Sequence, residues 1–524
     1  MSIAAPLRLV ASVLVLVLVS ASPALAADVH YAIVIGNNAP PAGEPLAALR
    51  FADDDAARYY GVLARLSESV VLLTVLDADS QKRYPTYAGL AQRPTLKNLR
   101  VALERLRPSM ERDLARGDRP VLYLTFSGHG TLDARGRGQL SLLDEPLTQA
   151  VLYDELLASI PDVWTHLIVD ACHAGAVVGV RGGESGELDT AQREGSAEEV
   201  ASLLQQAPLA RFPHVGALIA TARGQEAHEW QEVESGVFTH EVISALVGAA
   251  DVNADGRVQY TEVEAFAAAA NRTLPDPRAV AHIKVRLPVA DGRAVLLPVA
   301  ALRDSVRLHA PRAGTLGRFH VELGSGLRYA EGHLSADAPL SLWLPAGAGP
   351  AFLRTASQEA AIALSGPPVA LSELRFGPRR QSARGSLDSA YSRHLFESPY
   401  GPDYYRGFVD RYGLTPAPQA DAAGAREPER SAVLATGLWV LSGAALVTSG
   451  VTGVLAFERK AELDDTALER RAHELDGEYR TLGTVSLVSL GVAAASLGGG
   501  LYLWLSADPG PSEEHVQFRV HGSF

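Results

Sequence analysis

The sequence predicts an α/β fold, a mostly parallel sheet flanked by helices, followed by a β-rich region and a two-helix transmembrane hairpin. Across residues 27–280, short apolar runs alternate with segments whose apolar residues recur at helical spacing. Across residues 281–375, short strand-like runs are separated by Gly and Pro turns, which is typical of antiparallel sheets. Nearer the C-terminus, residues 431–457 and 481–506 form two uncharged apolar runs.

Strands and helices are predicted to alternate along residues 27–280. The strands are expected at residues 29–35, 70–76, 121–125, 166–169 and 215–221. The helices are expected at residues 49–66, 95–106, 153–160 and 238–247. Thr95 is the expected N-cap of the second helix, and residues 53–55, all Asp, lie in the first turn of the first helix, where the helix dipole favours negative charge. Several strands are wholly apolar, which favours a parallel sheet covered on both faces.

Composition limits the partners and the compartment. The chain has 524 residues and a formal net charge of -13, which argues against nucleic acid because phosphate binding needs basic patches. It has one cysteine, which excludes an intramolecular disulfide, so the compartment must be inferred from the N-terminus.

Residues 1–26 have the pattern of a signal peptide. Arg8 precedes an apolar run at residues 9–19, and Ala24-Leu25-Ala26 forms a small-residue cleavage site. The alternative is an uncleaved anchor helix, but the apolar run is short for a membrane span. We therefore expect export.

The C-terminal part is expected to anchor the chain in a membrane. Residues 376–430 form a mixed segment and linker before the first apolar run, and residues 507–524 form a tail after the second. The connecting loop at residues 458–480 is rich in Arg and Lys, so the positive-inside tendency places it in the cytoplasm. Both flanks then lie outside, which agrees with export and predicts a periplasmic domain in a Gram-negative cell. Two buried helices of a soluble domain are the alternative.

Two short motifs carry the chemistry. Residues 126–130, Phe-Ser-Gly-His-Gly, end one apolar strand, and residues 170–175, Asp-Ala-Cys-His-Ala-Gly, end another. Cys172 would attack a carbonyl carbon and His129 would take and return its proton. The backbone N–H groups of Gly130 and Cys172 are the expected oxyanion donors. A buried structural thiol and a core histidine are the alternatives, but their joint occurrence at strand ends beside glycines favours catalysis.

These motifs, with residues 31–38 and the Ala-Asp-Asp-Asp-Ala start of the first helix, resemble the caspase-like cysteine peptidases of family C14. The bacterial and metacaspase branch, whose cysteine motif is D-x-C-H-x-G, is most similar. The resemblance covers roughly residues 28–250 and implies a His129/Cys172 dyad. It also implies a substrate pocket containing Asp170, whose carboxylate would pair with a substrate Arg or Lys. Caspases that cleave after Asp have Gln-Ala-Cys-Arg at the cysteine, where this chain has Asp-Ala-Cys-His.

Residues 251–262 satisfy the pattern D-x-[DN]-x-[DN]-G-x5-E of a calcium-binding loop. Gly256 provides the sharp turn. The expected ligands are the side chains of Asp251, Asn253, Asp255 and Glu262 and the carbonyl of Arg257. A solvated acidic turn is the alternative. A single loop of this kind is expected to bind calcium weakly, in a structural or regulatory role.

Together these features predict a membrane-anchored cysteine endopeptidase, facing outside the cytoplasm, that cleaves proteins or peptides after Arg or Lys without a catalytic cofactor. The alternative is a catalytically silent caspase-like module that binds partners or senses a signal at the membrane. The intact pair of His129 and Cys172 favours the enzyme. The partners of the β-rich region are not predicted.

Overall fold

The computed structural model describes residues 27–41, 43–44, 46–133, 135, 137–171, 208–221, 229–276, 279–379, 389–417, 446, 449–462 and 469–506. The predicted signal peptide, Cys172 and the predicted tail lie outside these ranges. The chain divides into two units, residues 25–420 and residues 1–24 with 421–524. Each is described by itself.

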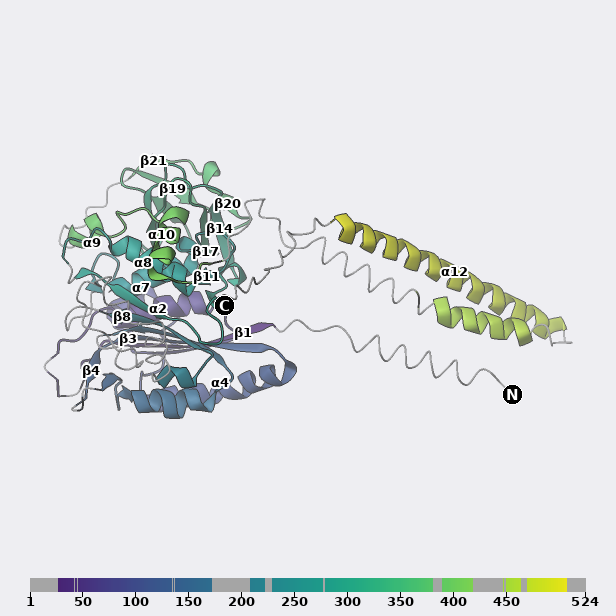
Figure 1. Ribbon diagram of the computed structural model, residues 1–524, viewed down its shortest axis with the longest axis horizontal. Coiled ribbons are helices and arrows are strands. Elements are labelled where there is room, and N and C mark those ends of the chain that lie inside the picture. The colour runs from purple at the N-terminus through teal and green to yellow at the C-terminus, as the bar shows by residue number, and fades with distance from the viewer. Residues whose placement is uncertain are drawn as a thin grey trace, which may run out of the picture. The chain divides into compact units, whose positions relative to one another are not determined.

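A six-stranded sheet forms the centre of the first unit (Figure 1), in the order β12-β8-β7-β3-β1-β2. Its strands are β1 (Asp28–Asn37), β2 (Ser69–Thr74), β3 (Arg119–Gly128), β7 (Trp164–Asp170), β8 (Val215–Thr221) and β12 (His282–Arg286). All neighbours are parallel except the edge strand β12, which is antiparallel to β8. The predicted α/β fold with a mostly parallel sheet is confirmed.

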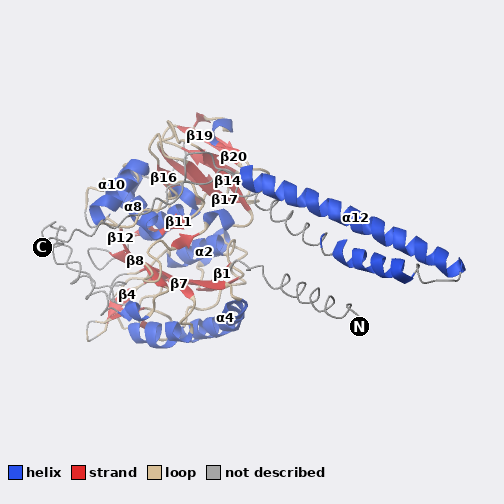
Figure 2. Ribbon diagram, turned by 45° about the vertical axis from the view of Figure 1, so that its right-hand side comes forward, coloured by secondary structure: helices blue, strands red, loops and turns tan. Residues whose placement is uncertain are grey.

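Helices cover both faces of this sheet (Figures 1 and 2). The helices of this unit up to residue 271 are α2 (Ala52–Leu63), α3 (Ala78–Arg83), α4 (Leu96–Arg116), α7 (Val237–Ser244) and α8 (Tyr260–Asn271), with the shorter turns η1 (Val151–Leu156), η2 (Leu157–Ser159), η4 (Pro208–Arg211) and η5 (Ala245–Ala249). Apolar residues of α2, α7 and α8 share one core with the sheet, and those of α4 share the other. The strands feed both cores, because Val34 faces the first and Ile33 the second.

Helix α4 begins as predicted and ends later. Thr95 is its N-cap, since its Oγ1 accepts the N–H of Asn98 at 3.0 Å. The expected end near residue 106 is wrong, because α4 continues through Pro108 to Arg116. Met110 extends its buried face beyond the proline.

Short strands lie around the carboxyl edge of the main sheet and around residues 251–262, the predicted calcium loop. They are β4 (Gly130–Leu132), β5 (Gly138–Leu140), β6 (Leu147–Thr148), β9 (Glu229–Trp230), β10 (Ser235–Gly236), β11 (Val258–Gln259) and β13 (Val295–Leu297). Two apolar runs expected in the β-rich region lie elsewhere. The run at 283–287 forms β12 of the main sheet, and β13 pairs with β11, which lies within the predicted calcium loop.

The β-rich region contains two sheets and lies on the α2 side of the main sheet, opposite α4 (Figure 2). One has the order β17-β14-β20 and the other the order β16-β15-β18-β19-β21. Their strands are β14 (Ser305–Ala310), β15 (Arg318–Leu323), β16 (Arg328–His333), β17 (Leu340–Pro345), β18 (Ala351–Arg354), β19 (Gln358–Ile362), β20 (Val369–Ala370) and β21 (Gly377–Pro378). Short turns η7 (Val299–Ala301) and η8 (Leu371–Glu373) accompany them, and helices α9 (Ser389–His394) and α10 (Pro402–Tyr412) follow.

The second unit is helical where it is described. Residues 449–462 are helical, and α12 spans Glu469–Ser506. Ser449 and Ser486 each donate a hydroxyl hydrogen bond to the other's carbonyl oxygen, at 2.9 Å. Among the described residues no helix combines the length and apolar character needed to cross a membrane. Most of the first predicted span, 431–457, lies outside them. The second, 481–506, lies within α12, which does not meet this condition, so the predicted hairpin is not shown.

Candidate active site

The predicted catalytic histidine lies at the carboxyl edge of the sheet. His129 immediately follows β3, and β3 pairs with β7 so that Ser127 is opposite Asp170. Gly128 precedes His129 at the end of β3. A Cβ atom at this position would lie 3.0 Å from the carbonyl oxygen of Asn37 and 2.9 Å from the Phe126 ring. The close approach of β1 therefore requires glycine at this position.

One nitrogen of the His129 imidazole is already engaged. Its Nε2 lies 3.0 Å from the carbonyl oxygen of Ala47. A carbonyl oxygen can only accept, so Nε2 carries the proton and Nδ1 of the neutral ring has a free lone pair. Partial burial lowers the pKa of His129, despite the opposing effect of this hydrogen bond. The ring is thus held neutral and oriented as a proton acceptor at Nδ1.

The predicted nucleophile and base occupy equivalent sequence positions after two paired strands. Cys172 is outside the described residues, but it follows Asp170 by two positions, as His129 follows Ser127. The Cys172–His129 pairing remains a prediction.

Gly130, a predicted oxyanion donor, begins the small sheet of β4, β5 and β6. The carbonyl of His129 accepts the N–H of Ser141 at 2.9 Å, and Gly130 is opposite Leu140 in the antiparallel ladder. Hydrogen-bonded and non-hydrogen-bonded pairs alternate along such a ladder, so the N–H of Gly130 points away from β5. This orientation is compatible with the predicted role.

Asp170, which is partly buried, lies beside Asp55 of α2, which is buried. Thr239 donates its hydroxyl to Oδ2 of Asp170 at 2.8 Å. Asp55 accepts hydrogen bonds from the hydroxyls of Ser127, at 2.7 Å, and Ser235, at 2.5 Å. These three hydroxyl donors keep both carboxylates in place.

A glycine separates the two carboxylates. A side chain at Gly236 would lie 2.6 Å from Oδ2 of Asp170 and 3.1 Å from Oδ2 of Asp55, so both oxygens face the same point. Burial raises the pKa of each carboxyl group, and the charge of Asp170 raises the pKa of Asp55 further.

Within the described ranges neither carboxylate forms an ion pair with Arg or Lys. A guanidinium or ammonium group that entered between them would stabilise both charges. We name Asp55, Asp170 and the hydroxyls of Ser127, Ser235 and Thr239 the acidic pocket.

The sequence interpretation identified Asp170 but missed the other members of the acidic pocket. Residues 53–55 were interpreted through the helix dipole alone, yet all three are buried. Asp53 accepts from Asn38 at 2.7 Å, and Asp54 pairs with Arg83 at 2.6 Å. Only Asp55 faces the pocket. Three consecutive acids at the start of an otherwise apolar helix were the available signal.

The acidic loop at 251–262 has its side chains turned inward. Asp251 accepts the N–H groups of Asp255 and Gly256 at 3.1 and 3.0 Å, and Glu262 accepts those of Val252 and Gln259 at 3.3 and 2.9 Å. Gly256 has a left-handed backbone, with φ of 76°, which confirms the predicted sharp turn. In the part of the chain that the structure describes, no three His, Cys, Asp or Glu side chains are grouped to hold a metal ion.

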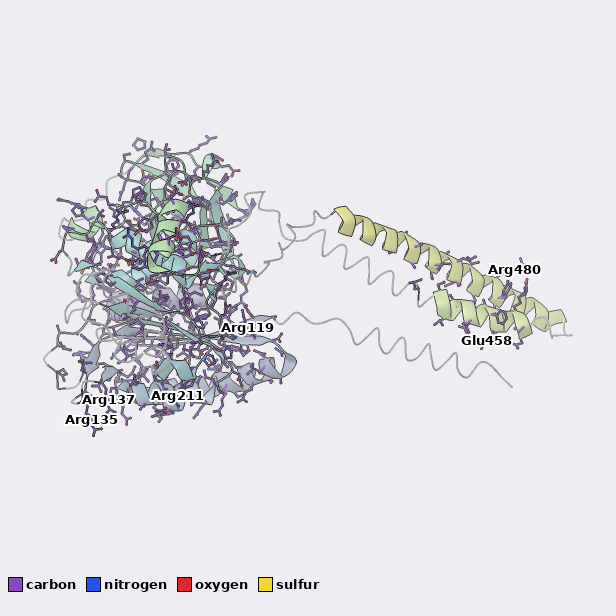
Figure 3. All side chains as sticks on the ribbon, in the orientation of Figure 1. Arg119, Arg135, Arg137, Arg211, Glu458 and Arg480 are labelled. Atoms are coloured by element: carbon purple, nitrogen blue, oxygen red, sulfur yellow. The ribbon has the colours of Figure 1, made fainter. Side chains whose placement is uncertain are left out.

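A cavity of about 310 Å³ lies at the opposite end of the strands. Asp28, His30 and Arg119, which begin β1 and β3, line it together with Arg257 and Arg293. Figure 3 shows Arg119 on the far side of the domain from Arg135 and Arg137, which follow His129 in the β4–β5 hairpin. This cavity is therefore separate from the acidic pocket.

The carboxyl edge of the mostly parallel sheet thus carries an imidazole hydrogen-bonded at Nε2 and the acidic pocket. The model of the caspase domain, peptidase family C14, matches residues 29–274. Residues 29–274 therefore match the caspase-like peptidase family, which confirms the resemblance inferred from the motifs. No curated protein compared with the chain matches it significantly.

Proposed function

We propose that the protein is a cysteine endopeptidase that cleaves after Arg or Lys, with Cys172 as nucleophile and His129 as base. The observation that carries the specificity is the pair of adjacent carboxylates, Asp55, which is buried, and Asp170, which is partly buried, neither of which forms an ion pair with Arg or Lys among the described residues. Buried charges are costly unless they are paired, so such a site favours a basic side chain.

The proposed reaction assigns each group one task. Nδ1 of His129 takes the thiol proton, and the Cys172 sulfur forms a bond to the carbonyl carbon of the scissile peptide. The N–H groups of Gly130 and Cys172 stabilise the oxyanion. His129 then gives the proton to the leaving amine, the C–N bond breaks, and water hydrolyses the thioester to release the carboxylic acid and the thiol. The carbonyl of Ala47 keeps the imidazole oriented throughout.

The direct test uses the purified full-length protein and peptides that differ in one residue. Substrates ending in Arg, Lys, citrulline, Leu or Asp before a fluorogenic amide are compared. Citrulline has the shape of Arg without its charge, so we expect kcat/KM to be higher for Arg by about 100-fold or more. Equal cleavage of the Arg and citrulline peptides, or preference for Asp, would contradict the proposal.

The pH dependence follows from the lowered pKa of His129. A lowered pKa keeps the imidazole neutral further into acid than the ordinary value near 6.5 allows. We therefore expect the acid limb of kcat/KM for an uncharged peptide to have its midpoint below about 6.5. An acid limb with a midpoint above this value would show that the base is in another environment.

We further propose that residues 251–262 bind calcium. The donors are all oxygen atoms, which calcium prefers, and Asp251 and Glu262 are buried without an ion-pair partner in the described ranges. The pairing of Val258 in β11 with Leu297 in β13 supports the loop. Asp251, Asn253, Asp255, Glu262 and the carbonyl of Arg257 would hold the ion, which would neutralise their charge.

Calcium is expected to raise the melting temperature of the full-length protein. With a Kd of about 10⁻⁴ to 10⁻³ M, 10 mM calcium should raise Tm by a few degrees. Glu262→Gln should remove this shift. Glu111→Gln, at an exposed carboxylate of α4, should retain it. An equal shift with magnesium, or none with calcium in the wild type, would contradict the proposal.

The location is also part of the proposal, and it is supported by sequence alone. Residues 1–26 would export the chain, and residues 431–457 and 481–506 would anchor it with the peptidase domain outside the cytoplasm. Cell fractionation followed by protease treatment of intact cells tests both parts. A peptidase domain recovered from the cytoplasm would contradict them.

A further inference from the structure

Strand β16 of the β-rich region packs directly against the helices that form the acidic pocket. The backbone N–H of Glu331 donates to Oγ of Ser244 in α7 at 3.0 Å. Two arginines contact the same strand from α2 and its C-terminal end. Arg58 of α2 donates to the carbonyl of Arg328 at 3.0 Å. Arg65, which follows α2, donates to the hydroxyl of Tyr329 at 2.9 Å. One strand therefore contacts both helices through its backbone and its side chains.

Glu331 is the centre of this contact. Its side chain is buried, and its two oxygens accept from Arg318 at 2.9 Å and Arg328 at 3.1 Å. Although burial acts to raise its pKa, the charge of Arg328 and the hydrogen bond from His240 hold the pKa of Glu331 well below its usual range. It is therefore a buried anion surrounded by donors.

His240 of α7 connects this anion to α2. Its Nε2 lies 3.4 Å from Oε2 of Glu331, and its Nδ1 lies 3.0 Å from Nη2 of Arg58. A carboxylate only accepts and a guanidinium only donates, so Nε2 carries a proton and Nδ1 does not. Burial lowers the pKa of His240 to about 4, in agreement with a neutral ring. Arg58, His240 and Glu331 thus form an ordered chain of two hydrogen bonds. We name these three residues the relay.

The relay ends beside the acidic pocket. Arg58 follows Asp55 by three residues on α2, so their side chains lie on the same face of the helix. His240 follows Thr239, whose hydroxyl holds Asp170. The relay therefore fixes two helices that each supply one contact to the pocket.

We propose that Glu331 is a positioning residue for substrate specificity, because it sets the separation of Asp55 and Thr239 through the relay. This inference depends on the proposed function, since the acidic pocket is its object. Glu331 lies outside residues 29–274, the caspase domain, so the β-rich region would complete the peptidase site.

The test compares the full-length wild type with Glu331→Gln and with the control Glu359→Gln. Glu359 pairs with Arg354 at 3.1 Å in the same sheet, without a described contact to α2 or α7. For the Arg peptide, Glu331→Gln is expected to raise KM by about tenfold and to leave kcat within about twofold, because misplacement of a binding group weakens binding of the cation. The rate of Cys172 alkylation by uncharged iodoacetamide should be unchanged.

Hydrogen exchange provides a measurement that does not require activity. Peptides covering residues 52–63 and 237–244 should exchange faster in Glu331→Gln than in the wild type and the control. If Glu331→Gln fails to fold, Arg318→Gln, which removes a partly exposed partner of Glu331, should show the same changes to a smaller extent.

The outcomes separate the two proposals. A wild type that does not cleave the Arg peptide contradicts the proposed function. An active wild type with an unchanged KM in the folded Glu331→Gln variant overturns the positioning role. Exchange in α2 and α7 that equals the control overturns it whether or not the wild type is active.

Discussion

Replacing Cys172 with alanine is expected to lower kcat/KM for the Arg peptide by about 10⁴-fold or more, because no other thiol can form the acyl-enzyme. His129→Ala should have an effect of similar size, since the thiol would lose its base. The double variant should be little worse than either single variant, because the two groups act as a unit. Initial rates of fluorogenic peptide cleavage measure all three.

The control for this prediction is stability. Neither substitution removes a large apolar side chain, so Tm should stay close to that of the wild type. Cys172→Ala that retained more than a few per cent of the wild-type rate would show that the cleavage comes from another residue or from a contaminating peptidase.

Asp170→Asn is expected to lower kcat/KM for the Arg peptide by about 10² to 10³-fold, because the substrate cation would lose its charged partner inside a buried site. The citrulline peptide should be cleaved at nearly the wild-type rate. Asp55→Asn should shift the preference in the same direction. Comparison of the two peptides therefore separates a specificity change from a general loss of activity.

A second buried carboxylate provides the matched control. Asp113 of α4 accepts the hydroxyl of Tyr31 at 2.5 Å on the other face of the sheet. Asp113→Asn should lower Tm while it keeps the ratio of Arg to citrulline cleavage. An unchanged ratio in Asp170→Asn would contradict its role in the acidic pocket.

Much of the main sheet could be predicted because its strands are continuous apolar runs. The five parallel strands lie where these runs occur, and the N-cap at Thr95 needed only local chemistry. The end of α4 was missed because a proline normally ends a helix, whereas packing of Met110 favours continuation here. Local signals therefore predicted where elements begin better than where they end.

The acidic pocket could be predicted only in part because its members are distant in sequence. Asp170 lies beside the cysteine, and its motif identified it. Asp55 and Ser235 are 180 residues apart, and only the fold brings them within 2.5 Å. The antiparallel strand β12 was assigned to the wrong sheet for the same reason, since an apolar run does not specify its partner.

Strand β12 is needed to cover the edge of the main sheet in any isolated peptidase domain. The strand begins at His282, after the caspase match ends at residue 274, and it covers the outer edge of β8. A fragment ended at 274 would leave the unpaired N–H and C=O groups of an apolar strand exposed to other chains, a recognised cause of aggregation. A fragment meant to stay in solution is therefore expected to extend past residue 274 to include β12.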